Sequence, residues 1–346
     1  MLRSAFVSWM VLVPLFLAAA GTAAAAGPTR VIFDTDLGAD IDDALALAMI
    51  HALQARGDCR LVAVTLTNAE PRAAALVDAI NTFYGHGDTP IGAARNGKAA
   101  ASHYLETAEL RDGDRLRYPR KVQSGKDLPA AVDVLRRVLA AQPDGSVVIA
   151  QVGLSSNLAA LLQSGPDQAS PLPGPELVKR KVKLLSVMGG AFVPIEGNAR
   201  YAEYNIKSDL PASRRLAADW PTPIVWSGFE IGLAVPYPAT SIEHDFGYVR
   251  HHPIADAYRL YEKMPYDRPS WDLTAVLYGL LPDRGYFDLS PPGRVTVDED
   301  GATRFEKQEG GPHRYLILRP EQRGRVKEAL VQLASQPPCA AAKEAR

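Results

Sequence analysis

The sequence predicts a single α/β domain with a mostly parallel central sheet flanked by helices. Short runs of β-branched and apolar residues alternate with longer segments of helical composition and spacing. Such runs are typical of strands buried on both faces, and their alternation with helices predicts βαβ units. We see no internal repeat or low-complexity linker, so one domain is expected over residues 27–337.

The expected elements follow from these patterns in chain order. Five core strands are expected, at residues 30–34, 61–66, 146–151, 182–188 and 223–227. Four helices are expected between them, at residues 44–53, 73–83, 128–141 and 158–162. Near the end, short strands at 294–297, 303–306 and 314–318 precede a closing helix at 321–334. The polar or Pro- and Gly-containing stretches 95–126, 164–175 and 237–269 are expected to be loops, the last a candidate binding segment.

The two ends of the chain are predicted to lie outside the domain. Arg3 precedes an apolar stretch and a run of small residues, a pattern that predicts a signal peptide over residues 1–26 with cleavage after Ala26. The apolar stretch is short for a bilayer span, and no lipid-accepting cysteine follows it. We therefore expect a soluble periplasmic or secreted product, with a disordered tail at residues 338–346.

Net charge and cysteine content indicate which ligands and which kinds of site to expect. The formal net charge of −1 gives no overall attraction to nucleic acid, which favours a small-molecule substrate. Cys59 and Cys339 are too few for a disulfide scaffold and lack the Cys-x-x-Cys spacing of zinc and redox sites. We expect them to be unpaired.

The most informative feature is an acidic run at residues 34–43. It holds five aspartates, at 34, 36, 40, 42 and 43, between the first strand and the first helix. Parallel sheets bind ligands at this carboxyl edge. Helix capping explains one or two of these carboxylates, but five would repel one another unless a cation lies among them. Dense carboxylates are typical of sites for hard cations such as Ca²⁺.

Other acidic or catalytic motifs fit less well. An EF-hand loop needs a glycine and a glutamate at positions where this run has neither. Phosphatases of the haloacid-dehalogenase type share Asp-x-Asp after the first strand but not the adjacent pair Asp42-Asp43, and they stay a distant alternative. The sequence has no Walker A, His-Glu-x-x-His, Gly-x-Ser-x-Gly or Gly-x-Gly-x-x-Gly motif.

Five blocks in order carry a family resemblance. They are Asp-Thr-Asp-Leu-Gly at 34–38 with Asp-Asp-Ala at 42–44, Val-Gly-Leu-Ser-Ser-Asn-Leu-Ala at 152–159, Met-Gly-Gly at 188–190, Glu-Tyr-Asn-Ile at 203–206 and Trp-Asp-Leu-Thr-Ala at 271–275. With these blocks the chain resembles the inosine/uridine-preferring nucleoside hydrolase family over nearly all of its mature length.

The resemblance implies a nucleoside-hydrolase-like fold and calcium-dependent hydrolysis of ribonucleosides to free base and ribose, in nucleoside catabolism and salvage. It places calcium on Asp36, Asp43 and Asp272 and on the backbone carbonyl of Ser156, with Asp36 also taking the proton of the attacking water. The substrate-binding positions are matched by Asp42, Asn68, Met188, Asn198, Glu203 and Asn205, with Met188 beneath the sugar. Because members of the family commonly self-associate, we expect a homo-oligomer.

The chain departs from the family in two places. Trp271 stands where the family has a histidine; it cannot donate a proton at neutral pH, but its ring could stack on the base and its N–H could donate a hydrogen bond. His103, His244, His251 and His252 are open candidates for the missing acid. The first block also carries a two-residue insertion containing Asp40, for which a calcium ligand, a ribose contact and a solvent-facing residue all stay open.

Alternatives also stay open for single residues and for the whole protein. Asn157 is expected to cap the helix at 158, while Met188 could be plain core and Asn68 could merely end a strand. The protein could be a sugar- or nucleoside-binding pseudoenzyme, or it could hydrolyse a related N-riboside such as nicotinamide riboside. The preferred base is not determined by the sequence.

Overall fold

The structure is a computed structural model that describes Met1, residues 27–95 and residues 97–338. Apart from Met1, the predicted signal peptide lies outside the described residues, as does the tail from residue 339 onward. Cys59 is buried and unpaired within the described part, with its thiol donating to the carbonyl of Ile50 at 3.5 Å. Cys339 falls outside it, so the absence of a disulfide between the two stays a prediction.

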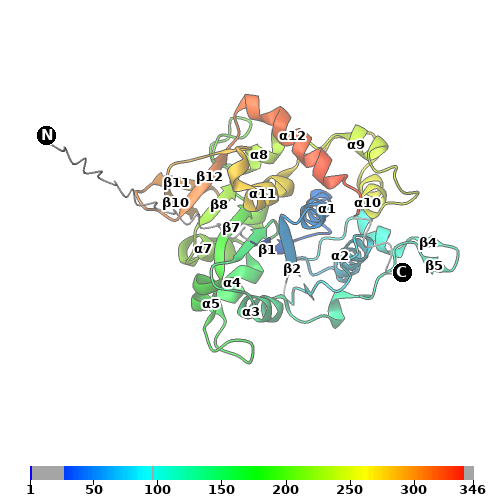
Figure 1. Ribbon diagram of the computed structural model, residues 1–346, viewed down its shortest axis with the longest axis horizontal. Coiled ribbons are helices and arrows are strands. Elements are labelled where there is room, and N and C mark those ends of the chain that lie inside the picture. The colour runs from blue at the N-terminus through cyan, green and yellow to red at the C-terminus, as the bar shows by residue number, and fades with distance from the viewer. Residues whose placement is uncertain (2–26, 96, 339–346) are drawn as a thin grey trace.

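One large sheet organises the molecule (Figure 1). Its strands are β1 (Thr29–Thr35), β2 (Cys59–Leu66), β3 (Ile91–Gly92), β6 (Val147–Gln151), β7 (Val182–Met188), β8 (Ile224–Ser227), β9 (Asp288–Leu289), β10 (Gly293–Val297), β11 (Thr303–Lys307) and β12 (His313–Ile317). Their order is β11-β10-β12-β8-β7-β6-β1-β2-β3, with β9 beside β12. From β3 to β12 through the centre all pairs are parallel, and β9, β10 and β11 pair in antiparallel fashion. β4 (Arg111–Asp112) and β5 (Arg115–Leu116) form a separate hairpin.

Helices cover both faces of this sheet, as predicted (Figure 1). Those on one face include α1 (Asp42–Ala55), α11 (Trp271–Leu280) and α12 (Pro320–Ala334). Those on the other include α3 (Ala131–Ala141), α4 (Ser156–Gln163), α5 (Gly174–Lys181) and α7 (Leu210–Asp219). The remaining α-helices are α2 (Pro71–Phe83), α6 (Tyr204–Ser208), α8 (Phe229–Leu233), α9 (Ala239–His244) and α10 (Pro253–Tyr261). None of the helices described is long and apolar enough to cross a bilayer.

Strand β1 shows why the core strands are continuously apolar. Val31 and Phe33 belong to the apolar core on the face of α1 and α11, whereas Ile32 belongs to the core on the opposite face. All three are fully buried. Successive side chains of a strand point to opposite faces, so a strand covered on both sides carries consecutive apolar residues through its middle. The prediction of a sheet buried on both faces is confirmed.

The segments predicted to be loops contain more structure than expected. Residues 95–126 include the 3₁₀ helix η1 (His103–Glu109), in which Tyr104 and Leu105 are buried. Helices α9 and α10 lie within 237–269, and α5 begins at the end of the stretch 164–175. These predictions were wrong because such short helices are stabilised mainly by packing against the domain, which a local pattern does not record.

The strand order changes direction at β1, because the strands that follow it in sequence are added first on one side of β1 and then on the other. The chain runs from β1 to β2 and β3 on one side, and then from β6 to β7 and β8 on the other. The carboxyl ends of β1 and β6 therefore border the crevice where ligands bind in open α/β sheets. Gly153, just after β6, packs so closely on this edge that a Cβ there would lie 2.5 Å from the backbone nitrogen of Asp36.

We expect Gly153→Ala to destabilise the protein by about 1–3 kcal/mol, because the added methyl must displace the turn that carries Asp36. Urea unfolding of the purified variant measures this loss. Gly165→Ala is the matched control, since a Cβ at Gly165 meets nothing within 4 Å. Equal stability of the Gly153 variant and the control would contradict the close approach.

Candidate active site

A cavity of about 420 Å³ lies at the carboxyl edge, near the ends of β1, β6 and β7. It is lined by Asp36, Ala39, Asp40, Asp42, Asp43, Ala100, Val152, Met188, Glu203, Tyr204, Asn205, Phe229, Arg268, Trp271 and Asp272. The structure thus brings together the following residues that were predicted to act at the site: Asp36, Asp42, Asp43, Met188, Glu203, Asn205, Trp271 and Asp272.

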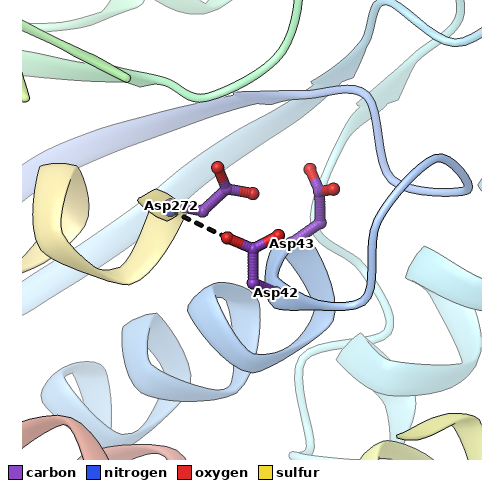
Figure 2. A group of neighbouring side chains, drawn as sticks. All are labelled: Asp42, Asp43 and Asp272. Atoms are coloured by element: carbon purple, nitrogen blue, oxygen red, sulfur yellow. Dashed lines mark hydrogen bonds between the residues drawn. The ribbon is translucent and has the colours of Figure 1, made fainter. Parts of the chain in front are cut away.

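Three buried carboxylates form the acidic centre of the cavity. Asp42 and Asp43 lie on the first turn of α1, and Asp272 lies on the first turn of α11 (Figure 2). One oxygen from each lies within 4.8 Å of the others. The backbone N–H of Asp272 donates to Oδ2 of Asp42 at 3.1 Å, which fixes the two helix starts against each other. Two segments more than two hundred residues apart therefore meet at one cluster.

The chemistry of this cluster suits a metal ion. Oδ1 of Asp43 accepts a hydrogen bond from the hydroxyl of Thr35, while its Oδ2 is buried with no partner among the described residues. Burial, and then repulsion from neighbouring carboxylates, raises the pKa of Asp42, Asp43 and Asp272 well above the usual value. A hard divalent cation would use the free oxygen and offset this repulsion. The acidic triad could therefore hold a metal ion.

The two remaining buried aspartates of the run differ in role. Burial raises the pKa of Asp36 to about 7, with further contributions from the carboxylates of Asp40 and Glu203, and its side chain borders the cavity. Asp34 is fully buried and accepts hydrogen bonds from Thr65 at 2.5 Å and from Asn157 at 2.8 Å. Asp34 therefore supports the site from beneath.

Asn157 does not cap a helix. Helix α4 begins two residues earlier than expected, at Ser156, and its N-cap is Ser155. The Asn157 amide donates both to Asp34 and to the backbone carbonyl of Leu66, at 3.1 Å. It ties α4 to β1 and β2, a contact between distant segments that no local capping rule could reveal.

Glu203 and Asn205 offer acceptor oxygens to the cavity. Glu203 is the N-cap of α6, and its carboxylate accepts the backbone N–H groups of Asn205 at 2.8 Å and Ile206 at 3.1 Å. The Asn205 amide nitrogen donates to the carbonyls of Val152 at 2.7 Å and Met188 at 3.3 Å. These bonds fix the orientation of the Asn205 side-chain amide. Its oxygen is then the atom that can accept a hydrogen bond from a ligand hydroxyl.

Three predicted site residues do not line the cavity. The side chain of Asn68 donates to the carbonyls of Leu37 at 3.1 Å and Ala100 at 2.8 Å, and it thereby holds the turn after Asp36 from outside. Asn198 is exposed in a turn with Ile195 and accepts the backbone N–H of Arg200. Ser156, whose carbonyl was expected to bind calcium, is the first residue of α4 and does not line the cavity. In this part of the chain the cavity is lined by Val152, which follows β6 directly.

Trp271 lines the cavity, but its N–H is already engaged. The indole nitrogen donates to the carbonyl of Phe229 at 2.9 Å, and the two rings stack with their centroids 5.1 Å apart. Of the two possibilities left by the sequence, a hydrogen bond from this N–H to a base is therefore disfavoured, and an aromatic wall remains.

None of the four candidate histidines lines the cavity. His103 and His244 are exposed on the surface, and His251 borders a different cavity. His252 is buried, where desolvation lowers its pKa to about 3. The structure therefore supplies no histidine at the place of the missing acid among its described residues.

Sequence reasoning missed Arg268, the cationic residue of the cavity wall. Its Nε donates to Oδ1 of Asp40 at 2.9 Å, and its Nη2 donates to Oδ2 of the same carboxylate. The role of Asp40, left open by the sequence, is therefore an ion pair. The only sequence signal was an extra acid in the insertion that needed a cation, with nothing to show which arginine provides it.

The family of the chain follows from its match to a known model. The model for inosine-uridine preferring nucleoside hydrolases matches residues 31–331. The chain belongs to this family. Nucleoside hydrolases are N-glycosidases, and both family and fold support hydrolysis of N-ribosides in general. The predicted family and enzyme class are confirmed.

Solved structures agree on the fold of this nucleoside hydrolase. A plant nucleoside hydrolase has a TM-score of 0.66 at 22% identity, covering 90% of this chain and 100% of that one. A purine-preferring ribonucleoside hydrolase from Gardnerella vaginalis has a TM-score of 0.65 at 18% identity, covering 88% and 98%. A type III effector protein, XopQ, in complex with adenosine diphosphate ribose has a TM-score of 0.66 at 17% identity, covering 91% and 95%. No curated protein sequence matches the chain significantly.

The raised pKa of Asp36 predicts a pH-dependent effect on stability. A carboxyl whose pKa rises from 3.8 to about 7 on folding is stabilising when protonated, and that contribution is lost as the pH increases over this interval. In the presence of a chelator, we expect the free energy of unfolding of Asp36→Asn to increase relative to that of the unmodified chain between pH 4.5 and pH 7.5 (about the interval of this titration). Loss of the Asp36 charge also lowers the pKa of Asp42, Asp43 and Asp272 in the folded state, which changes the stability in the same direction, whereas groups away from this cluster are common to both proteins and cancel.

The control for this measurement is Asp167→Asn. Its hydrogen bonds with Arg136 lower the pKa of Asp167 to about 2, so this carboxyl is ionised in both states over the same pH interval. The difference from the unmodified chain should then stay constant with pH. A constant difference for Asp36→Asn as well would refute the raised pKa.

Proposed function

We propose that this nucleoside hydrolase cleaves the N-glycosidic bond of ribonucleosides to free base and ribose, in a calcium-dependent reaction. The observation that carries the proposal is the meeting of the acidic triad, Asp36 and the acceptors Glu203 and Asn205 in one cavity. Its volume of about 420 Å³ lies in the usual range for small-molecule sites.

Calcium suits the donors that are present. The cluster offers carboxylate oxygens and no nitrogen or sulfur ligand among the described residues, as hard Ca²⁺ prefers. Asp43 and Asp272 would hold the ion, and Asp42 is the third carboxylate within reach. When bound, the ion would make a water molecule more acidic.

The sugar would be held by the acceptors on the far side of the cavity. Glu203 and Asn205 are fixed by backbone contacts and offer oxygens to ribose hydroxyls. Met188, at the end of β7, gives an apolar surface beneath the ring. Rigid acceptors of this kind orient carbon C1′ before reaction, which lowers the entropic part of the barrier.

Asp36 would act as the general base. Its carboxylate borders the same cavity as the acidic triad and the sugar acceptors, where it can take a proton from water. The water oxygen forms a bond to C1′ as the bond from C1′ to the base nitrogen breaks, and the electron pair leaves with the base. The proton taken by Asp36 returns to solvent, and the base is released protonated.

A larger N-riboside is the second candidate. The effector protein of the same fold was solved with adenosine diphosphate ribose, a riboside with an extended substituent. In this chain Tyr204 lines the cavity and is half-exposed, so the cavity opens to solvent on that side. An extended substituent would have room there.

A product assay separates these candidates. Purified protein should release free base from at least one of inosine, uridine, adenosine, guanosine and nicotinamide riboside, and a chelator should abolish release until calcium is added back. Adenosine diphosphate ribose belongs in the same panel. Binding of ribosides without release of base or ribose from any of them would refute the enzyme proposal in favour of a binding protein.

The assignment of Asp43 to the metal is tested by metal content. Asp43→Ala should lose bound calcium after dialysis, as measured by atomic emission, because it removes the carboxylate that has a free buried oxygen. Asp78→Ala is the matched control: Asp78 is equally buried but bonds to the backbone of Lys121 and Val122. Unchanged calcium in the Asp43 variant would remove this residue from the metal site.

A further inference from the structure

The departing base needs a hydrogen-bond donor, because breaking the N-glycosidic bond leaves an electron pair on its nitrogen. The side-chain donors on the cavity wall are few. The amide of Asn205 and the indole N–H of Trp271 are already bonded to backbone carbonyls. Among the lining residues this leaves the hydroxyl of Tyr204 and the guanidinium of Arg268.

Arg268 has donors to spare. A guanidinium carries five N–H groups, and the ion pair with Asp40 uses one on Nε and one on Nη2. Among the described residues Nη1 makes no hydrogen bond, and the carboxylate of Glu262 lies 3.8 Å from it, beyond hydrogen-bond distance. Nη1 and the second N–H of Nη2 therefore remain available to a ligand.

Arg268 is also held in a fixed position beside the aromatic wall. Its backbone exchanges two hydrogen bonds with Tyr237, at 2.7 and 3.0 Å. Its guanidinium carbon lies 5.1 Å from the ring centre of Tyr261 and 5.4 Å from that of Trp271. A planar cation in contact with two rings and paired at two points with a carboxylate loses little further freedom on binding.

Asp40 holds Arg268 at the cavity wall through their ion pair. It belongs to the two-residue insertion before Asp42, and the hydroxyl of Tyr104 donates to its backbone carbonyl at 2.6 Å. The insertion thus carries a carboxylate to the cavity wall, where it fixes Arg268. Trp271 stands three residues after Arg268 and is in contact with it, so both departures from the family pattern meet at one point.

We propose that Arg268, positioned by Asp40, donates a hydrogen bond to the departing base in place of the missing histidine. The inference rests on the proposed function. It selects bases with an acceptor, such as a carbonyl oxygen or an unprotonated ring nitrogen, that can reach Nη1 or Nη2. Arg268 keeps its own protons: as the bond to C1′ breaks, its hydrogen bond stabilises the electron pair on the base, and the base then takes a proton from water.

Two substrates with different leaving groups test this role. We expect Arg268→Met to lower kcat/KM for inosine by about 100-fold, the usual scale for loss of one transition-state donor. It should change kcat/KM for p-nitrophenyl riboside by less than about threefold, because the nitrophenolate leaves without assistance. A parallel fall for both substrates, or no fall for inosine, would overturn the proposal.

Three further variants separate the loss of the donor from indirect effects of the substitution. Asp40→Asn with Arg268→Met removes both charges and should show the same substrate-dependent loss, which distinguishes the missing donor from an unpaired carboxylate. Arg117→Met, which breaks an ion pair with Asp256 outside the cavity, should leave the ratio of the two rates unchanged. If Tyr204→Phe instead shows the selective loss, Tyr204 is the donor and the proposal for Arg268 is wrong.

The unmodified enzyme distinguishes failure of the hydrolase function from failure of the arginine role. If it releases base from no riboside in the panel and no phenol from p-nitrophenyl riboside, the proposed function fails and the role of Arg268 fails with it. If it cleaves both substrates and Arg268→Met reduces both equally, the hydrolase remains and only the leaving-group role is rejected.

Discussion

The structure depends on one electrostatic constraint, the burial of several carboxylates at the carboxyl end of β1. Desolvation and mutual repulsion raise the pKa of Asp36, Asp42 and Asp43. Such a cluster is stable when it is protonated or when cations lie within it. Arg268 lowers the pKa of Asp42 from one side, but its ion pair is with Asp40 and leaves the charge of the acidic triad uncompensated. The free oxygen of Asp43 is left for an ion from solution.

The sheet topology is what allows this concentration of charge. The crevice beside β1 collects the first turns of α1 and α11, together with the end of β7 and the start of α6, from positions far apart in the chain. Two contacts hold the backbone of the turn that carries Asp36. Gly153 packs closely against it, and the side-chain amide of Asn68 donates to the carbonyl of Leu37. A site built on such fixed elements can orient its groups without rearrangement on binding.

The same geometry places hydrogen-bond acceptors and hydrogen-bond donors in different parts of the cavity. Glu203 and Asn205 offer acceptors only, which suits sugar hydroxyls, whereas Arg268 offers donors only, which suits a departing base. Trp271 adds an aromatic wall, since its N–H is bonded to Phe229. The exchange of histidine for tryptophan therefore need not remove leaving-group assistance, provided that another element brings a donor to the same place.

The sequence by itself determined the parallel α/β fold, the family and most of the carboxylates and acceptors of the cavity, because these lie in contiguous blocks next to strand ends and helix starts. It did not determine the partners of those residues. Asn68 and Asn157 hold backbone segments together across the sheet edge, and short helices formed where loops were expected. The partner of Asp40 lies 228 residues away in a segment without a motif. Only tertiary packing brings Arg268 to the cavity, since its position depends on contacts with Tyr237, Tyr261 and Trp271 that no local pattern encodes.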